Sequence, residues 1–430
     1  CVADLRALSK PDLWLDGLFG FGLERSISGE LAAQIDWLNQ QPQPVLSIDL
    51  PSGLHTDTGH VMGTAVQATQ TICLGLWKVG LLQDEALSYL GQVELLDFDL
   101  PLTDIGAVLG AVPSLQRLTP NQVASHLPLP VPPTSHKYRR GHLLLIAGSQ
   151  QYRGAVILAG LGARASGIGM LSIAVTQALQ AQVSQALPEA LVIPCPETET
   201  GAIAQLPTAI DLSTYTAIAC GPGLSLKTGP FLEAVLSTPC PLILDADALN
   251  WLTQQSRTAQ ELLHSRPSTT IMTPHPGEFR RLFPDLATQS LRRDQQALQA
   301  AQAANTTVVL KGARVAIAQP NSQVWLNAHS SSALARGGTG DVLTGLMGGL
   351  LAIQTASNNL PQTNLLQTKA INSITKAVVT AVVWHALAGA IAAQDRTELG
   401  VDAWTLTQYL IPALQQFSSP LSSPLVPCHS

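Results

Sequence analysis

The residues best suited to binding or catalysis are Gly-Gly-Thr-Gly-Asp at positions 337–341, which run directly into a strongly apolar stretch. The pattern predicts a glycine turn at the start of a helix, where unpaired N–H groups and a partial positive charge attract anions. Glycines lack a Cβ, so phosphate oxygens can approach those N–H groups closely. Asp341 would then lie beside a bound phosphate and could accept a proton from a hydroxyl. By itself, the pattern fits an Asp that only caps a helix equally well.

Three further loops follow short apolar runs and carry residues suited to chemistry. His275 stands between two prolines in Thr-Pro-His-Pro-Gly-Glu, which stiffens the loop and favours a polar ligand contact over a purely structural role. Lys311-Gly312 could meet phosphate charge, although an ordinary lysine at a strand end fits as well. Asp245 and Asp247 could hold Mg²⁺ through water or merely cap the next helix.

Short apolar runs alternate with helical patterns around these loops, which is the layout of a doubly wound α/β domain. One helix is expected at 154–166. Strands are expected at residues 142–149, 171–175, 217–221, 241–245, 270–273 and 307–310, with a hairpin of 314–318 and 323–326 at the sheet edge. Ligands bind such sheets at the carboxyl ends of the strands. The loops, including a rigid Gly-Pro-Gly turn at 221–223, are therefore expected to converge on one face.

The chain is expected to fold as two α/β domains. In the first, strands at 13–17, 45–49 and 71–74 surround a helix at 29–39, which indicates parallel βαβ units. We predict a partial Rossmann-like domain over 1–105, a proline-rich linker over 106–135, a second domain over 136–415 and a disordered tail over 416–430. Residues 354–368, rich in Gln and Asn, are expected to form a surface loop.

The composition argues against several classes of protein. A net charge of -6 and the scarcity of basic clusters disfavour a nucleic-acid partner. The longest apolar stretch, 377–393, contains His385 and is too short for a membrane span. The six cysteines show no C-x-x-C spacing, so neither a zinc site nor a disulfide framework is indicated, and Cys220 and Cys240 are expected to be buried thiols. Without a signal-peptide pattern or a membrane span, the chain is expected to be cytoplasmic. Charged residues form only 12% of the chain, which favours a homo-oligomer, such as a tetramer, with part of its surface buried between subunits.

In their order along the chain, these motifs resemble the ribokinase-like dehydratases that repair hydrated NADH and NADPH. The resemblance covers residues 136–415 and is carried by 142–149, Tyr-Arg-Gly-Ala at 152–155, 221–223, 245–250, 273–278, 311–312 and 337–341. The first region resembles the carboxyl-terminal half of the companion epimerase domain, through residues 16–25, 47–53, 57–59 and 78–81. The chain therefore resembles the family of bifunctional NAD(P)H-hydrate repair enzymes.

The resemblance implies roles for individual residues of the dehydratase. The hydrated nicotinamide nucleotide is expected against Ala155, Gly223, His275 and Asp341. The adenine nucleotide is expected against Lys311, Gly312, Ala313, Arg314, Val315, Gly338, Thr339 and Gly340. Asp341 would accept the proton of the ring hydroxyl while the nucleotide, carried with Mg²⁺, donates a phosphoryl group that then leaves as phosphate. ADP rather than ATP is expected, because the fused architecture is typical of bacterial members.

The resemblance also implies a site in the epimerase half. Its substrate is expected against Gly20, Phe21, Gly22, Leu23, Glu24, Arg25, Ser26 and Asp49, with Asp49 as proton acceptor. A K⁺ ion is expected near Asp16 and Ser52, since hard oxygen ligands suit such a cation. The Asn-Asn-Gly-Gly-Asp loop of the family would precede Cys1, the first residue here. We therefore expect an amino-terminally truncated epimerase half, and dehydratase activity without epimerase activity.

Two alternatives share part of this pattern. A small-alcohol kinase of the same superfamily, acting for example on a vitamin precursor, would use the same phosphate loop and the same fold. Residues 273–278 and the attached epimerase half favour the repair enzyme. A catalytically silent nucleotide-binding module would not need Asp341.

Overall fold

The computed structural model describes residues 11–110, 112–358 and 373–418. Contacts divide the chain into two units, one that extends to Ser114 and one that begins at Leu115. The boundary falls inside the segment 106–135 that was expected to be a linker. Residues Leu115–Leu118 form strand β5 and Pro120–Ala124 form helix α4, and both belong to the second unit.

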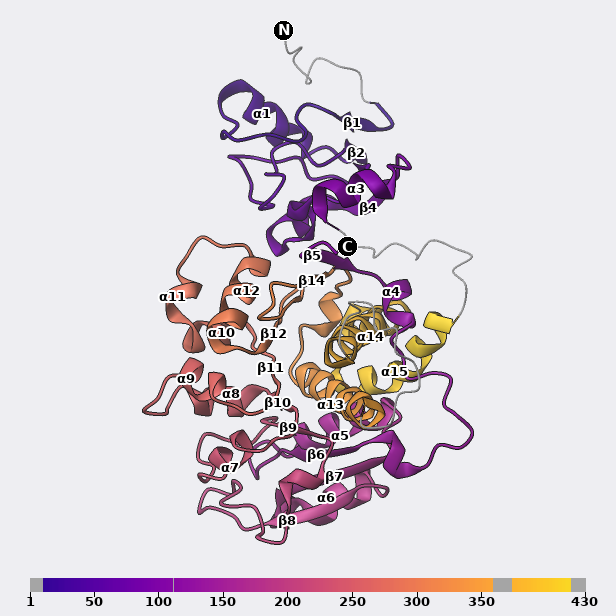
Figure 1. The fold of residues 1–430 in the computed structure, drawn as a ribbon. Coiled ribbons are helices and arrows are strands. Elements are labelled where there is room, and N and C mark those ends of the chain that lie inside the picture. Colours follow the sequence, from indigo (N-terminus) through magenta and orange to yellow (C-terminus); the bar gives the residue numbers. More distant parts are fainter. Residues whose placement is uncertain (1–10, 111, 359–372, 419–430) are drawn as a thin grey trace. The chain divides into compact units, whose positions relative to one another are not determined.

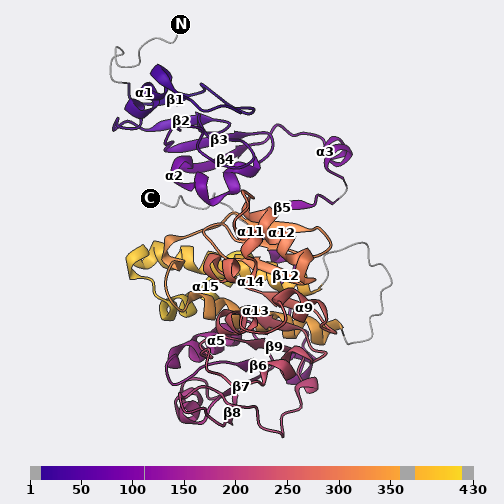
Figure 2. The same ribbon diagram turned by 90° about the vertical axis from the view of Figure 1, so that its left-hand side faces the viewer.

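The first unit is built on a four-stranded parallel sheet in the order β1-β2-β3-β4 (Figure 2). Its elements are β1 (Trp14–Asp16), α1 (Gly29–Leu38), β2 (Val45–Ile48), β3 (Gln70–Leu74), α2 (Leu87–Leu90), β4 (Gln92–Leu96) and α3 (Leu102–Leu109). Alternate residues of β2 and β3 are buried, as the two-residue period of a strand requires. The sequence analysis missed β4, an edge strand in which no residue is fully buried.

The second unit contains a ten-stranded sheet in the order β5-β14-β13-β12-β11-β10-β9-β6-β7-β8 (Figure 1). Its strands after β5 are β6 (His142–Ile146), β7 (Met170–Thr176), β8 (Leu191–Cys195), β9 (Ala217–Cys220), β10 (Leu242–Leu244), β11 (Thr270–Met272), β12 (Thr307–Leu310), β13 (Ala316–Ala318) and β14 (Val324–Asn327). Every residue of β9 to β12 is buried, which explains their continuous apolar sequences. The β13–β14 hairpin is present, but it does not form the sheet edge, because β5 pairs with β14.

Helices cover both faces of this sheet. The helices after α4 are α5 (Arg153–Ala165), α6 (Gln180–Ala186), α7 (Leu232–Leu236), α8 (Ala246–Leu252), α9 (Ala259–His264), α10 (Pro276–Leu282), α11 (Pro284–Ala287), α12 (Arg293–Ala304), α13 (Thr339–Asn358), α14 (Ser373–Arg396) and α15 (Ala403–Ser418). Helices α5, α13, α14 and α15 lie on one side and α8, α9, α10 and α12 on the other (Figure 1). The predicted doubly wound architecture is confirmed.

The stretch 377–393, expected to be too short for a membrane span, belongs to the longer helix α14, so that expectation of its length was wrong. Helix α14 is the one helix in the described residues that is long and apolar enough to cross a membrane. Its most apolar window is 78% buried inside the unit, as expected for the core helix of a packed domain.

Two expected irregular segments differ in part from the structure. Residues 354–358, predicted to begin a surface loop, form the last turn of α13, and 359–368 lie outside the described residues. Residues 416–418 of the predicted tail end α15, and the rest of the tail also lies outside the described part. Cys220 and Cys240 are free and buried, as predicted.

Candidate active sites

The glycine turn predicted from the sequence leads into α13, and Asp341 lies in the first turn of that helix. Gly338 has φ +92°, and a Cβ there would lie 2.7 Å from a leucine side chain, so the position requires glycine. The Thr339 hydroxyl donates to two backbone carbonyls of the preceding turn, both at 2.9 Å. The turn is therefore held in a fixed shape immediately before Asp341.

A buried histidine on α14 also holds this turn. His385 Nε2 lies 2.8 Å from the carbonyl oxygen of Thr339. Burial lowers the pKa of His385 to about 4, so the ring is neutral and its Nε2 carries the proton that the carbonyl accepts. Sequence analysis used His385 only as an argument against a membrane span and missed this contact, because the two residues lie on different helices.

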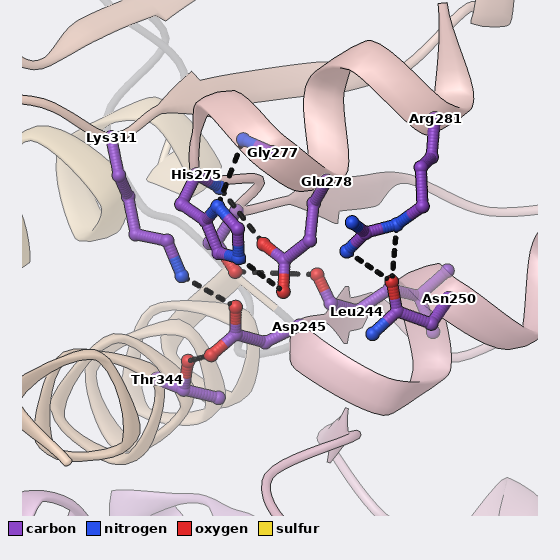
Figure 3. Close-up of polar contacts among 10 residues, drawn as sticks. Leu244, Asp245, Asn250, His275, Gly277, Glu278, Arg281, Lys311 and Thr344 are labelled. Carbon is purple, nitrogen blue, oxygen red and sulfur yellow. Dashed lines mark hydrogen bonds and ion pairs between the residues drawn. The ribbon is translucent and has the colours of Figure 1, made fainter. Parts of the chain in front are cut away.

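Asp245, Lys311 and Thr344 form a hydrogen-bonded group next to the turn (Figure 3). Lys311 Nζ donates to Asp245 Oδ1 at 2.8 Å, and Thr344 Oγ1 donates to Asp245 Oδ2 at 2.7 Å. Burial alone would raise the pKa of Asp245, but the Lys311 charge outweighs it and the pKa falls. Burial alone would likewise lower the pKa of Lys311, yet Asp245 raises it. Both groups are therefore charged, and they join the ends of β10 and β12 to α13.

The pKa of Asp341 is shifted in the opposite direction to that of Asp245. Burial, and after it the negative charge of Asp245, raises the pKa of Asp341 to about 7, although Lys311 opposes the shift. A Cβ placed on Gly340 would lie 3.4 Å from Lys311 Nζ, so the glycine leaves the ammonium close to the turn. Asp341 can therefore accept a proton near neutral pH while a cation remains beside the anion-binding turn.

The two roles considered for Asp245 and Asp247 were Mg²⁺ binding through water and helix capping. Asp245 precedes α8, but its side chain makes no capping hydrogen bond to the helix. Asp247 Oδ2 accepts from the backbone N–H of Ser225 at 2.8 Å. Within the described ranges, no group of three or more His, Cys, Asp or Glu side chains is arranged to hold a metal ion. Asp245 accepts hydrogen bonds from Lys311 and Thr344, and Mg²⁺ binding through water by the two acids stays a prediction.

His275 is the N-terminal cap of α10 and also faces the candidate site (Figure 3). The ring Nδ1 of His275 accepts from the backbone N–H of Gly277 at 2.9 Å. The backbone N–H of His275 donates to Glu278 Oε2 at 2.8 Å. Burial, then Lys311 and Arg281, lowers the pKa of His275. The side chain is still 51% exposed, so the neutral ring can contact a ligand while it caps the helix.

The remaining predicted dehydratase residues fall in two places. Ala155 lies in the first turn of α5, and a Cβ on Gly223 would lie 2.8 Å from the Cβ of Ala155, so the two backbones meet closely. Lys311 to Val315 form the connection between β12 and β13, with Ala313 exposed and Arg314 buried. Gly312 lies under the guanidinium of Arg293, which also donates to the Lys311 carbonyl at 2.9 Å.

In the first unit, Asp49 follows β2 with φ +73° and forms an ion pair with Lys78. A Cβ on Gly20 would lie 3.9 Å from Asp49 Oδ2, so part of the predicted segment 20–26 does lie beside Asp49. Phe21, Gly22, Glu24, Arg25 and Ser26 are exposed. The Leu23 side chain is instead buried in the core of the unit, so only its backbone remains available to a substrate.

Asp16 and Ser52 are in direct contact. Asp16 Oδ1 accepts from the Ser52 hydroxyl at 2.6 Å, and Oδ2 accepts from the Ser52 N–H at 2.9 Å and the Ser47 hydroxyl at 2.7 Å. Ser52 Oγ also lies 3.1 Å from the Phe19 carbonyl oxygen. Carboxylate, hydroxyl and carbonyl oxygens therefore meet at one buried point.

Sequence reasoning did not identify Thr344, Arg293 or the Arg281–Asn250 pair, in which Arg281 Nη2 donates to Asn250 Oδ1 at 2.7 Å. Thr344 lies three residues after Asp341, the spacing that places two residues on one helix face, so its position was a usable signal. The arginines carried no signal, because their partners lie on elements that are distant in the sequence.

Two family models match the chain. The model described as NAD(P)H-hydrate dehydratase matches residues 143–412. The model described as YjeF-related protein N-terminus matches residues 2–80, so neither the expected truncation nor the loss of epimerase activity expected from it is confirmed.

The chain is also similar to named proteins. It is 50% identical over 419 residues to a bifunctional NAD(P)H-hydrate repair enzyme of Synechocystis sp., covering 97% of this chain and 76% of that protein. The enzyme of the same name from Thermosynechococcus vestitus is 47% identical over 415 residues, covering 96% and 77%. Among solved structures, an ADP/ATP-dependent NAD(P)H-hydrate dehydratase from Bacillus subtilis, co-crystallized with ATP and Mg²⁺, is 34% identical, with a TM-score of 0.55 and coverage of 70% of this chain and 98% of that one.

Proposed function

Because the chain belongs to the family of bifunctional NAD(P)H-hydrate repair enzymes, we propose that its second unit dehydrates the S epimer of NAD(P)H hydrate with Asp341 as the base. The observation that carries this assignment is the position of Asp341. It lies between an anion-binding glycine turn and the Lys311–Asp245 ion pair, with its pKa raised to about 7. A base of that pKa suits proton transfer at neutral pH.

The reaction follows from the chemistry of the leaving group. Hydroxide leaves poorly, so the ring hydroxyl is first phosphorylated. Asp341 accepts its proton, the hydroxyl oxygen bonds to the terminal phosphorus of the nucleotide, and the bond from that phosphorus to the bridging oxygen breaks, so that the bridging oxygen leaves with the shortened nucleotide. The N–H groups of residues 338–340 stabilise charge on the phosphoryl oxygens. The lone pair of the ring nitrogen then expels phosphate from the carbon bonded to it. Loss of a proton from the next ring carbon forms the double bond that restores the dihydropyridine. With ADP, which we propose as the donor, the products are AMP, phosphate and NAD(P)H.

The nucleotide and the substrate would occupy the two residue groups already described. We propose that Lys311 to Val315, Gly338, Thr339 and Gly340 contact the nucleotide, and that Ala155, Gly223, His275 and Asp341 contact the hydrate. This proposal is supported by the proximity of Gly340 to Lys311 and by the close approach of Gly223 to Ala155. Mg²⁺ would be carried by the nucleotide phosphates and water, where it neutralises charge during transfer.

The decisive experiment measures recovery of reduced-nicotinamide absorbance from purified S-NADH hydrate with Mg²⁺ and either ADP or ATP. Recovery that requires a nucleotide supports the dehydratase and identifies the donor. No recovery from folded protein that still binds nucleotide would contradict it and favour the weaker alternative, a small-alcohol kinase.

We further propose that Asp49 accepts a proton in the epimerase half and that K⁺ binds at Asp16 and Ser52. The oxygen donors there, with the Phe19 carbonyl, are of the type that K⁺ prefers. Asp16 is only 3% exposed, and no basic side chain in the part of the chain that the structure describes pairs with it. A bound cation would compensate this buried carboxylate.

We also propose a homo-oligomer in a reducing, cytoplasmic location. The exposed side chains of Leu399, Trp404 and Ile411 support subunit contacts of the second unit. The four described cysteines are free, which fits a reducing compartment.

A further inference from the structure

A cavity of ≈ 400 Å³ in the second unit is lined by several basic side chains and by no acidic one. Residues 125–132, 134 and 135 form one wall, and the carboxyl-terminal part of α13 forms another. Arg139, Arg140, Lys376 and His126 all line it. Hydroxyl groups of serine and threonine side chains complete the polar part of the lining.

This cavity is separate from the candidate active site. Arg139 and Arg140 immediately precede β6, so they lie at the amino-terminal end of the sheet, whereas Asp245 and Lys311 follow the carboxyl ends of their strands. Ile353, which lines the cavity, is twelve residues after Asp341 on α13, or about 18 Å along the helix axis. The cavity and the candidate active site therefore lie toward opposite ends of the strands and of α13.

Within the part of the chain that the structure describes, the basic side chains of the cavity have no counter-charge. Among the described residues, none forms an ion pair with Arg139, Arg140 or Lys376. The neighbouring stretch 359–372 contains no Asp or Glu in its sequence. Arg140 is packed rather than free in solvent, because its guanidinium lies over Gly167, where a Cβ would be 2.6 Å from its Nη2.

The buried Nδ1 of His126 also has no hydrogen-bond partner among residues 11–110, 112–358 and 373–418. Burial, and after it the nearby Lys376 charge, lowers the pKa of His126, so the ring is neutral and can offer a donor or an acceptor. Like charges held together around a polar cavity are unfavourable unless an anion joins them. In a chain of net charge -6, this concentration of positive charge is local rather than general.

We propose that this cavity binds a small phosphate-bearing anion at a site distinct from the active site. Guanidinium groups match phosphate oxygens in pairs, and a lysine adds a point charge. The volume is that of a small-molecule site rather than of a macromolecular interface. The phosphate could belong to an inorganic anion or to a nucleotide, which share this chemistry.

The test uses the unmodified chain and measures acylation of individual lysines by mass spectrometry. Inorganic pyrophosphate is expected to slow labelling of Lys376 at least about fivefold, through direct contact with the ammonium. Lys137 is the internal control, because it is basic, lies two residues before Arg139 and is not part of the lining. Equal protection of both lysines, or of neither, would overturn the proposal. Stronger protection by AMP than by pyrophosphate would identify a nucleotide as the ligand class.

A variant series provides an independent measurement. Arg139→Gln/Arg140→Gln/Lys376→Gln is expected to lose pyrophosphate protection at His126, read by histidine-directed labelling, while Lys137→Gln retains it. Dehydration activity at saturating nucleotide should be unchanged in both. Sedimentation is measured in parallel, because protection of Lys376 that follows association of subunits would assign this face to an interface and refute the small-anion site.

Discussion

Lys311 Nζ lies 2.8 Å from Asp245 Oδ1, and this ion pair holds the Lys311 ammonium group in position in the candidate dehydratase site. The two residues follow strands β12 and β10, on either side of β11. Thr344 holds the second oxygen of Asp245, so the pair is also tied to the helix that carries Asp341. Lys311 is therefore compensated by Asp245 and cannot fully neutralise Asp341, which keeps its high pKa.

Replacing Asp341 by Asn should reduce turnover about 10²–10⁴-fold, the usual contribution of a positioned base. Nucleotide affinity should be largely retained, because the glycine turn and Lys311 remain. The measurement pairs the rate of NADH recovery from the S hydrate with a nucleotide titration. Unchanged turnover would remove Asp341 from the mechanism.

Turnover should depend on pH through the same residue. The pKa of Asp341 is raised to about 7, so the carboxyl is protonated and inactive as a base below that pH. The kcat/KM for the hydrate, which reports ionisations of the ligand-free enzyme, should therefore rise as pH increases through about 7 and level off above it. Between the ordinary Asp pKa of 3.8 and pH 7, the folded state binds more protons at Asp341 than the unfolded state does. The contribution of this residue to stability therefore falls as pH rises across that window. A kcat/KM that is flat across this range would contradict the assignment.

Replacing Asp245 by Asn should move that pH dependence to lower pH. The charges around Asp341 are Asp245, Lys311, Asp247 and Glu278, and Asp245 is the strongest of those that raise its pKa. Its loss removes a repelling charge and frees Lys311 to favour the Asp341 carboxylate. Thr344→Val is the matched control, since it removes a hydrogen bond to Asp245 and leaves the charge.

Loss of the partner of Lys311 also costs on the order of 3 kcal/mol, so thermal unfolding of the Asp245→Asn variant is measured first. A folded variant whose pH profile matches that of the unaltered protein would show that Asp245 does not set the Asp341 pKa.

His275 has two separable roles, which a pair of substitutions can distinguish. His275→Ala should destabilise the protein by about 1 kcal/mol, because the N–H of Gly277 loses its acceptor. His275→Asn should restore stability, since Asn is a good helix cap. If the ring contacts the hydrate, Asn will leave KM for the hydrate raised even though the cap is rebuilt. Recovery of both stability and KM in the Asn variant would reduce His275 to a structural residue.

Much of this arrangement could be predicted from the sequence, because local patterns carried it. The glycine turn before Asp341, and the strands that precede Asp245 and Lys311, follow from residue type and hydrophobic period alone. What those side chains contact could not be predicted. The ion pair joins residues 66 positions apart, and His385 reaches the turn from a helix whose apolar sequence indicated only burial.

The strands that were not expected from the sequence lie at the edges of the sheets. Strand β8 contains Pro194 and exposes Leu191, so its sequence lacks the continuous apolar run of a central strand. Strand β5 is short and lies in a segment whose prolines indicated a linker. Edge strands are stabilised by a neighbour on one side only, and their sequences show a correspondingly weak pattern.

Potassium should act locally on the first unit if Asp16 and Ser52 bind it. At a concentration ten times its Kd, K⁺ would stabilise the folded state by about 1.4 kcal/mol relative to an equal concentration of Na⁺ that does not bind. The local readout is hydrogen exchange at the Ser52 amide, which donates to Asp16 Oδ2 and should be slowed by K⁺. Ser52→Ala should abolish the difference between the two salts, whereas Ser47→Ala removes a bond to Asp16 without removing the hydroxyl next to the Phe19 carbonyl. Equal exchange of the amide in K⁺ and Na⁺ would exclude this site. If both serine variants lose the slowing by K⁺ to the same extent, the hydrogen-bond network of Asp16, rather than a cation, protects the amide.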